Sequence, residues 1–234
     1  MREIVFDTET TGLSPLNGDR IVEIGCVELD NKVETGRTFH SYFNPGRPMP
    51  SDAEAVHGLS DRFLSDKPAF AELSEALLAF IGEAPMIAHN ASFDFGFINH
   101  ELGACGRPSV CMTRMVDTLA LARQKFPGAK HSLDALCVRF GVDRSQRIKH
   151  GALLDAQLLA QVYVELTGGR QIGLGLVAEL IEAAGGAVES SAEAVMAVAV
   201  RPARPPRPHA PSAEELARHA AFLATIRDPI WNRL

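Results

Sequence analysis

The stretch Ile4–Gly12 carries the residues best suited to chemistry. It is a short apolar run that ends in two carboxylates, Asp7 and Glu9, before a turn. Side chains two residues apart in a strand point to the same face, so both acids share one face with Val5. Carboxylates held side by side at the end of a buried strand repel one another and cost stability unless a cation lies between them. The pattern therefore predicts a divalent metal site.

Two other interpretations of this motif have to be weighed. Taken alone, the pair of acids would be assigned to a solvated strand end. A metal site is favoured only if other parts of the chain supply further acids. A calcium loop of the EF-hand type is excluded for two reasons. Its twelfth position, which should be Glu, is Gly18, and a strand rather than a helix precedes the loop.

Asp155 provides the strongest independent signal for further acids. It lies in a helix predicted over Gly151–Leu166, where it is the one acid on the inward stripe. An acid at such a position is costly unless it is paired. The alternative is an acid in the first helical turn, where the helix dipole favours anions; we favour the metal site. The apolar neighbours on the same face are Ala152, Leu159, Val162 and Leu166.

Asp94 and His150 carry less information when each is taken singly. Asp94 falls in the first turn of a helix predicted over Ser92–Gly103, where the dipole also favours an acid, so both interpretations stay open. His150 precedes Asp155 by five residues, and inside one helix the two side chains would lie about 140° apart. We therefore place His150 on the loop before the helix, pointing into the same site as a general base. A surface histidine beside Lys149 is the alternative.

Composition and charge exclude several classes of protein. The 234 residues carry a net charge of −6, all of it in residues 1–169, which argues against tight, nonspecific binding to duplex nucleic acid. No apolar run reaches the length of a membrane span, and the N-terminus lacks the basic and apolar regions of a signal peptide. We therefore expect no membrane association and a cytoplasmic location.

The order of the elements predicts an α/β fold. Arg20–Leu29 and Lys32–Tyr42 are strand-like and join at Asp30-Asn31, so with the opening strand they form an antiparallel meander. Two later strands alternate with helices, which predicts a mixed five-stranded sheet, antiparallel and then parallel, with helices on its faces. The later strands are Met86–Ala88 and Met112–Val116, and the further helices are a short turn at Ala53–Gly58, Phe70–Ile81, a helix ending at Phe126, and one from the Ser132 cap to Phe140.

Beyond residue 169 the chain changes in character. Prolines and arginines predict an extended, flexible spacer with polyproline character. Ser212 and Glu215 have capping-box spacing at the start of a last helix, whose apolar stripe includes Leu216 and Leu223 and which Trp231 follows. A helix without a core of its own predicts a docking segment for another protein. The expected regions are a globular domain at 1–169, a linker region at 170–200, the spacer at 201–211 and the docking helix at 212–234.

Five segments spread over residues 1–169 have the order and spacing of the DEDDh 3′–5′ exonucleases. The chain resembles that family and, within it, the proofreading subunits of bacterial DNA polymerase III. The resemblance implies a ribonuclease H-like fold and removal of nucleotides from the 3′ end of DNA. The segments are FDTETTG, VHGLSD from Val56, AHNASFDFGF from Ala88, SLDALC from Ser132 and HGALLDAQLLAQVY from His150.

The resemblance also implies a role for each matching residue. Two divalent ions, Mg²⁺ or Mn²⁺, would be held by four acids, and His150 would be the general base. Two such ions can activate a water and stabilise the leaving oxygen of an in-line displacement, and carboxylate oxygens are the ligands they prefer. The metal-binding acids are Asp7, Glu9, Asp94 and Asp155. The residues expected to contact or shape the site of the terminal nucleotide are Glu9, Thr10, Thr11, Gly12, Asp52, His57, Asn90, Phe93 and Asp155, with Asp52 the loosest match.

The resemblance extends to the partners of the tail. The segment with Gln171, Leu174 and Leu176 is similar to the peptide with which replication proteins bind the sliding clamp. The last helix and Trp231 would then dock on the polymerase III alpha subunit, placing the protein at the bacterial replisome. A stand-alone DEDDh exonuclease acting on DNA or RNA ends in repair or RNA maturation is the alternative. A non-catalytic scaffold is a third hypothesis, against which the presence of all five active-site residue types argues.

Overall fold

The computed structural model describes residues 1–147, 149–169 and 210–226, which belong to two compact units, Met1–Ala178 and Glu179–Leu234. The first unit is built on a five-stranded sheet with the order β3-β2-β1-β4-β5. Strands β1 (Arg2–Thr10), β2 (Ile21–Asp30) and β3 (Val33–Tyr42) are antiparallel neighbours. Strands β4 (Met86–Ala88) and β5 (Met115–Asp117) continue the sheet in parallel with β1. The prediction of a mixed five-stranded sheet is confirmed.

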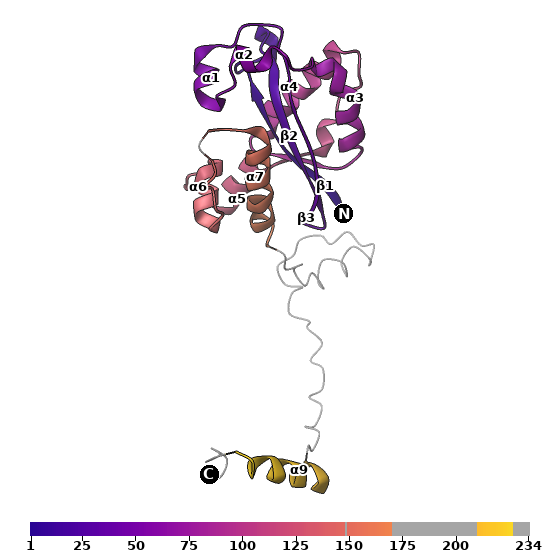
Figure 1. Ribbon diagram of the computed structural model, residues 1–234, viewed down its shortest axis with the longest axis vertical. Helices are drawn as coiled ribbons and strands as arrows, with labels where there is room; N and C mark the ends of the chain where they lie inside the picture. The colour runs from indigo at the N-terminus through magenta and orange to yellow at the C-terminus, as the bar shows by residue number, and fades with distance from the viewer. Residues whose placement is uncertain (148, 170–209, 227–234) are drawn as a thin grey trace, which may run out of the picture. The chain divides into compact units, whose positions relative to one another are not determined.

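Helices cover both faces of this sheet (Figure 1). Helices α3 and α4 lie on one face, and α7 lies on the other with α5 and α6 packed beside it. The short elements η1, α1 and α2 belong to the segments that connect the strands on the N-terminal side. The bounds are η1 Pro15–Asn17, α1 Ser51–His57, α2 Asp61–Leu64, α3 Phe70–Ile81, α4 Ala91–Ala104, η2 Met112–Arg114, α5 Thr118–Lys125, α6 Leu133–Phe140 and α7 Ala152–Leu166.

The alternation of side chains along β1 fixes where its acids point. Ile4 and Phe6 are fully buried in the core beneath α3 and α4. Val5 is fully buried in the opposite core, where it packs with Ala156 and Leu159 of α7. Because a strand repeats every two residues, the next side chains on the Val5 face belong to Asp7 and Glu9. The two acids therefore continue the apolar row that faces α7.

Gly25 allows α7 to lie directly against the sheet. It sits opposite Asp7 in the register of β1 and β2. A Cβ atom at this position would lie 2.3 Å from both the Cα and the backbone nitrogen of Leu153 in the first turn of α7. No side chain fits in that space, so only glycine permits this approach. The close contact brings the first turn of α7, with Asp155, next to the acid end of β1.

The hairpin between β2 and β3 turns one residue later than predicted. Its central residues are Asn31 and Lys32, both with positive φ (49° and 66°), so the predicted turn at Asp30-Asn31 is wrong by one position. Two-residue hairpins whose twist matches the strands need positive φ at both central positions. Asn31 adopts this conformation readily. Lys32 is held there by its ion pair with Glu3, 2.7 Å from Nζ to the carboxylate.

The start of α4 also differs from its prediction. The helix begins at Ala91, and its N-cap is Asn90 in the left-handed conformation (φ 64°), not Ser92. The backbone N–H of Asn90 donates to Asp117 Oδ1 at 3.0 Å, which ties the turn to the end of β5. This contact joins residues that are far apart in the sequence, so no local pattern predicts it, and it overrides the capping preference of Ser92. The predicted strand at Met112–Val116 is likewise only partly formed, since Met112–Arg114 is a 3₁₀ turn.

Within the second unit the structure describes one helix, α9 (Ala213–Leu223). Its start has the predicted capping box: Ser212 Oγ accepts from the backbone of Glu215, whose carboxylate accepts in turn from Ser212. Leu216 and Phe222 are exposed, and Leu223 is half-buried. Residues Gln171, Leu174, Leu176 and Trp231 lie outside the described residues. No described helix is both long and apolar enough to cross a membrane.

Candidate active site

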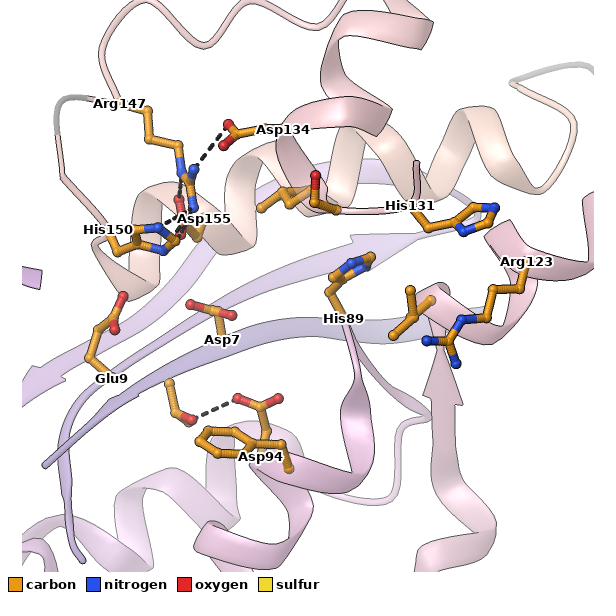
Figure 2. Close-up of a pocket in the computed structure, with 15 residues that line it drawn as sticks. Asp7, Glu9, His89, Asp94, Arg123, His131, Asp134, Arg147, His150 and Asp155 are labelled. Atoms are coloured by element: carbon orange, nitrogen blue, oxygen red, sulfur yellow. Dashed lines mark hydrogen bonds and ion pairs between the residues drawn. The ribbon is translucent and has the colours of Figure 1, made fainter. Parts of the chain in front are cut away.

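A groove of about 550 Å³ opens at the acid end of β1 (Figure 2). It brings together five of the residues selected from the sequence, and they come from three elements and one loop. Asp7 and Glu9 extend from β1, Asp94 from α4 and Asp155 from α7, while His150 lies on the loop before α7, as predicted. Residues separated by almost 150 positions therefore meet in one site.

Each acid is held in place by its own element. Asp94 reaches the groove from the face opposite α7, and its Oδ1 accepts a hydrogen bond from Thr8 Oγ1 at 2.6 Å. Asp155 is 2% exposed in the first turn of α7, where its backbone N–H donates to Gly151 O at 2.9 Å. His150 is about half exposed, with its Nδ1 3.3 Å from Asp155 Oδ2. The acids are fixed and the histidine is accessible.

Glu9 shows most directly that the groove suits a cation. Its Oε1 is buried and has no hydrogen-bond partner among the described residues. Ligand atoms of Glu9, His150 and Asp155 lie within 4.8 Å of one another. A buried carboxylate oxygen without a donor is costly, and a cation bound between these groups would remove that cost. The donor set of carboxylate oxygens and one imidazole fits a divalent ion.

Burial, followed by repulsion between neighbouring carboxylates, raises the pKa values of three of the acids. Burial raises the pKa of Glu9 to about 8, with further increases from the nearby charges of Asp155, Glu23 and Asp94. The pKa of Asp7 lies well above its ordinary value for the same reason, burial first and then the charges of its carboxylate neighbours. Burial likewise raises the pKa of Asp94, although the hydrogen bond from Thr8 opposes the change. Without a cation, Asp7, Glu9 and Asp94 are therefore harder to ionise than solvent-exposed carboxylic acids.

Arg147, on the loop that leads into α7, is a groove residue that the sequence did not reveal. Its guanidinium forms a bidentate ion pair with Asp155, with Nε to Oδ1 at 2.6 Å and Nη2 to Oδ2 at 2.7 Å. A third contact joins Nη1 to Asp134 Oδ1 at 3.0 Å. Its charge also lowers the pKa values of Asp7 and Glu9, against the effect of burial. From the sequence alone, Lys149 is the basic neighbour expected beside His150.

The other end of the groove is lined by basic side chains that the sequence analysis also missed (Figure 2). Arg123 is exposed and has no ion pair or hydrogen bond within the described part of the chain. His131 donates or accepts at Phe126 O, 2.7 Å from its Nε2, and His89 contacts Thr118 Oγ1 at 2.9 Å. Because His89 and His131 lie in connecting segments and Arg123 lies on the exposed side of α5, no sequence pattern marks them. The groove thus has acids at one end and, at the other, the guanidinium of Arg123 beside two imidazoles, of which that of His89 has its pKa lowered by burial.

The turn after Glu9 is braced internally. Thr10 Oγ1 donates to Gly12 O at 2.6 Å, and Thr11 Oγ1 accepts from the backbone N–H of Arg20 at 3.0 Å. Both threonines are buried and, with Gly12, lie beyond the lining of the groove. They position Glu9 at the end of β1 by holding the chain in its turn.

The remaining candidate substrate residues fall into two groups. Phe93 lines the groove beside Asp94, whereas Asp52 and Asn90 are exposed outside it. His57 is buried at the end of α1, and its Nδ1 accepts from the backbone N–H of Leu59 at 3.0 Å. The proton of the neutral ring is therefore on Nε2, which is buried and without a partner among the described residues. The ring of His57 thus faces the backbone of Thr10, beside the turn that follows Glu9.

Comparison with known proteins places this geometry in context. Residues 4–163 match the model of a family described as exonuclease. The chain is 48% identical to the DNA polymerase III subunit epsilon of Rickettsia felis over 97% of both chains. It is 41% identical to the subunit epsilon of Escherichia coli, over 97% of this chain and 93% of that one.

Solved structures show the same architecture. Exonuclease X in complex with 5′ overhanging duplex DNA is 26% identical, with a TM-score of 0.55 over 70% of this chain and 90% of that one. The nuclease domain of 3′hExo, a DEDDh family member bound to rAMP, is 16% identical. Its TM-score of 0.62 over 71% of this chain and 91% of that one shows a shared fold. The ribonuclease H-like fold expected from the sequence is confirmed.

Proposed function

The chain belongs to the exonuclease family and, within it, to the DNA polymerase III epsilon subunits, and on this premise we propose how its groove performs proofreading. The protein is a 3′–5′ exodeoxyribonuclease that removes mispaired nucleotides from the primer end. The observation that carries the assignment is the convergence of four carboxylates and one accessible histidine on a single groove. The expected products are a 5′-nucleotide and a strand shortened by one residue.

We propose that the acids hold two divalent ions, Mg²⁺ or Mn²⁺. The candidate ligands are Asp7, Glu9, Asp94 and Asp155. The unpartnered oxygen of Glu9 and the raised pKa values of the acids support this assignment, because a cation would relieve both. When bound, such ions stabilise the charge that develops on the phosphate and on the leaving 3′ oxygen.

The chain's own residues supply the rest of the chemistry. His150 takes the proton from the attacking water, for which its half-exposed position at the rim of the groove is suitable. Phe93 lines the groove and presents an aromatic face for stacking of the terminal base. His57 would donate a hydrogen bond from Nε2 to the terminal nucleotide, close to the turn at Thr10. Asp52 and Asn90 would reach the nucleotide only from outside the groove.

We propose that the strand leaves the acids along the basic end of the groove. Arg123 is free to pair with a backbone phosphate, and the imidazoles of His89 and His131 add hydrogen-bonding groups beside it. Contacts to phosphates carry no sequence information, which suits an enzyme that must remove any mispaired base. Because the domain carries a net negative charge, the guanidinium of Arg123 provides a local attraction for phosphates that the overall charge lacks.

The tail would deliver this nuclease to its substrate at the replisome in the cytoplasm. Helix α9 is capped, but none of its residues is buried, and Leu216 and Phe222 project from it unpacked. Such a helix suits docking in a groove of a partner, which we propose to be the polymerase III alpha subunit, with Leu223 and Trp231 also contributing. The segment with Gln171, Leu174 and Leu176 would bind the sliding clamp. A tether raises the local concentration of the nuclease and removes the need for tight DNA binding.

One assay tests the proposed function. The purified protein is incubated with matched primers, 3′-mismatched primers and a single RNA strand, with Mg²⁺ or Mn²⁺ and with EDTA. We expect faster release of 5′-nucleotides from mismatched ends, little cleavage of RNA and none in EDTA. Equal cleavage of RNA would favour a stand-alone nuclease of RNA maturation. Cleavage that continues in EDTA would refute the metal site.

A further inference from the structure

The guanidinium of Arg147 lies against Asp155, one of the candidate metal ligands (Figure 2). It engages both carboxylate oxygens of Asp155 at 2.6 and 2.7 Å. The side chain of Arg147 is 9% exposed and that of Asp155 is 3% exposed, so this is an ion pair largely removed from solvent. Each oxygen of Asp155 therefore accepts a hydrogen bond from a cationic group, which a metal ion bound to Asp155 would meet as a competitor and a like charge.

The same guanidinium also contacts His150, the candidate general base. Its Nη2 lies 2.8 Å from Nδ1 of His150. Arginine has only donors, so the ring nitrogen that carries the single lone pair of the neutral imidazole accepts from Nη2, which lies 2.8 Å from Nδ1 and 3.4 Å from Nε2. A ring in this state has no free lone pair with which to take a proton from water. Arg147 therefore blocks the candidate ligand Asp155 and the candidate base His150 together.

We propose that Arg147 is a built-in counter-ion that holds the metal-free groove in an inactive arrangement and is displaced by the divalent ions. This inference rests on the proposed function. Asp134 provides the position to which Arg147 withdraws, because its Oδ1 already accepts from Nη1 of Arg147 at 3.0 Å. One arginine thereby couples metal binding to the release of His150.

This role predicts that two properties change in opposite directions when Arg147 is removed. The buried carboxylate of Asp155 would lose its counter-ion, so the metal-free protein would become less stable. A divalent ion would no longer have to displace a cation, so metal affinity would rise. An arginine that merely orders the loop would give another result, because its loss would lower stability and metal affinity together.

The experiment measures Mn²⁺ binding to the full chain without DNA, by electron paramagnetic resonance of the free ion, together with the thermal midpoint in EDTA. Arg147→Gln should bind Mn²⁺ at least tenfold more tightly than the wild type and have a lower midpoint. The matched control is Arg144→Gln. Arg144 pairs with the same Asp134 oxygen at 2.8 Å but does not contact Asp155, so its loss should leave Mn²⁺ affinity within twofold of the wild type.

A second variant keeps the test informative if Arg147→Gln fails to fold. Arg147→Lys retains the charge that Asp155 needs but loses the bidentate contact, and it should bind Mn²⁺ roughly threefold more tightly than the wild type. Unchanged or weaker Mn²⁺ binding by the folded Arg147 variants would overturn the inference. Failure of the wild type itself to bind Mn²⁺ would instead refute the metal site of the proposed function.

Discussion

Replacing Glu9 by Gln should abolish cleavage and yet stabilise the metal-free protein. The Glu9 side chain is nearly buried, and burial followed by the charge of Asp155 raises its pKa from 4.5 to about 8. Between these two values the folded protein binds a proton that the unfolded chain has lost, so stability decreases as the pH rises. Gln has nearly the shape of the protonated acid and never ionises, so the variant escapes this loss.

The size of the effect follows from the pKa shift. A pH of 7 lies about 2.5 units above the pKa of Glu9 in the unfolded chain. At about 1.36 kcal/mol per unit, the loss of folding free energy at pH 7 that comes from Glu9 is roughly 3 kcal/mol. For a chain of this size, 1 kcal/mol corresponds to about 2–4 °C, so the midpoint should rise by roughly 6–12 °C at pH 7. The gain should be close to zero below about pH 4.5 and should level off near pH 8.

The assay compares thermal midpoints of the wild type and Glu9→Gln in EDTA between pH 5 and pH 8.5. Glu28→Gln is the matched control, since Glu28 is also a buried acid of this sheet. Burial would raise the pKa of Glu28, but hydrogen bonds from Arg2 and Thr35 and the charge of Arg37 leave it lowered. Its replacement should therefore destabilise the protein at pH 7. Identical midpoints for Glu9→Gln and the wild type across this range would refute the reasoning.

Three further predictions follow from the geometry. His150→Ala should lower kcat by about 10²–10⁴-fold; a loss below tenfold in single-turnover cleavage would exclude it as the base. Gly25→Ala should cost about 1–3 kcal/mol and also reduce activity, because its Cβ would meet the backbone of Leu153 at 2.3 Å and displace the first turn of α7. Gly96→Ala, with nothing within 4 Å of the added carbon, is the control, and equal urea midpoints for the two variants would contradict the prediction. Arg123→Ala should weaken single-strand binding and reduce its salt slope by about one; an unchanged slope, measured by fluorescence anisotropy, would remove Arg123 from the DNA path.

The sequence predicted those elements whose signals are local. The bounds of α3 and β4 agree with the predicted Phe70–Ile81 and Met86–Ala88, because helical periodicity or a short apolar run marks each of them. The prediction failed where a distant residue decides the local conformation. Asn90 caps α4 in place of Ser92 because Asp117 holds its backbone, a contact between residues 27 positions apart.

Within the candidate site too, residues with a local sequence signal could be predicted, and residues that matter only through their surroundings in space could not. Asp7 and Asp155 were identifiable because each is a charged residue in an apolar row, an arrangement that is costly without a function. Arg147 and Arg123 interrupt no such row, since one lies on a loop and the other on an exposed helical turn. Their importance comes only from what surrounds them in space, and the sequence contains no periodic signal for that.

The carboxylates of the groove repel one another, and the groups that offset this repulsion link catalysis to folding. Its acids can ionise together only beside a cation, and without metal the available compensation is protons on Asp7 and Glu9 and the guanidinium of Arg147 on Asp155. On the mechanism that we propose, divalent ions would replace both, so that they would release protons and free His150 in the same event. A proofreading nuclease held close to correctly paired primers benefits from this coupling, because the arrangement that hydrolyses DNA is then assembled only with its ions in place.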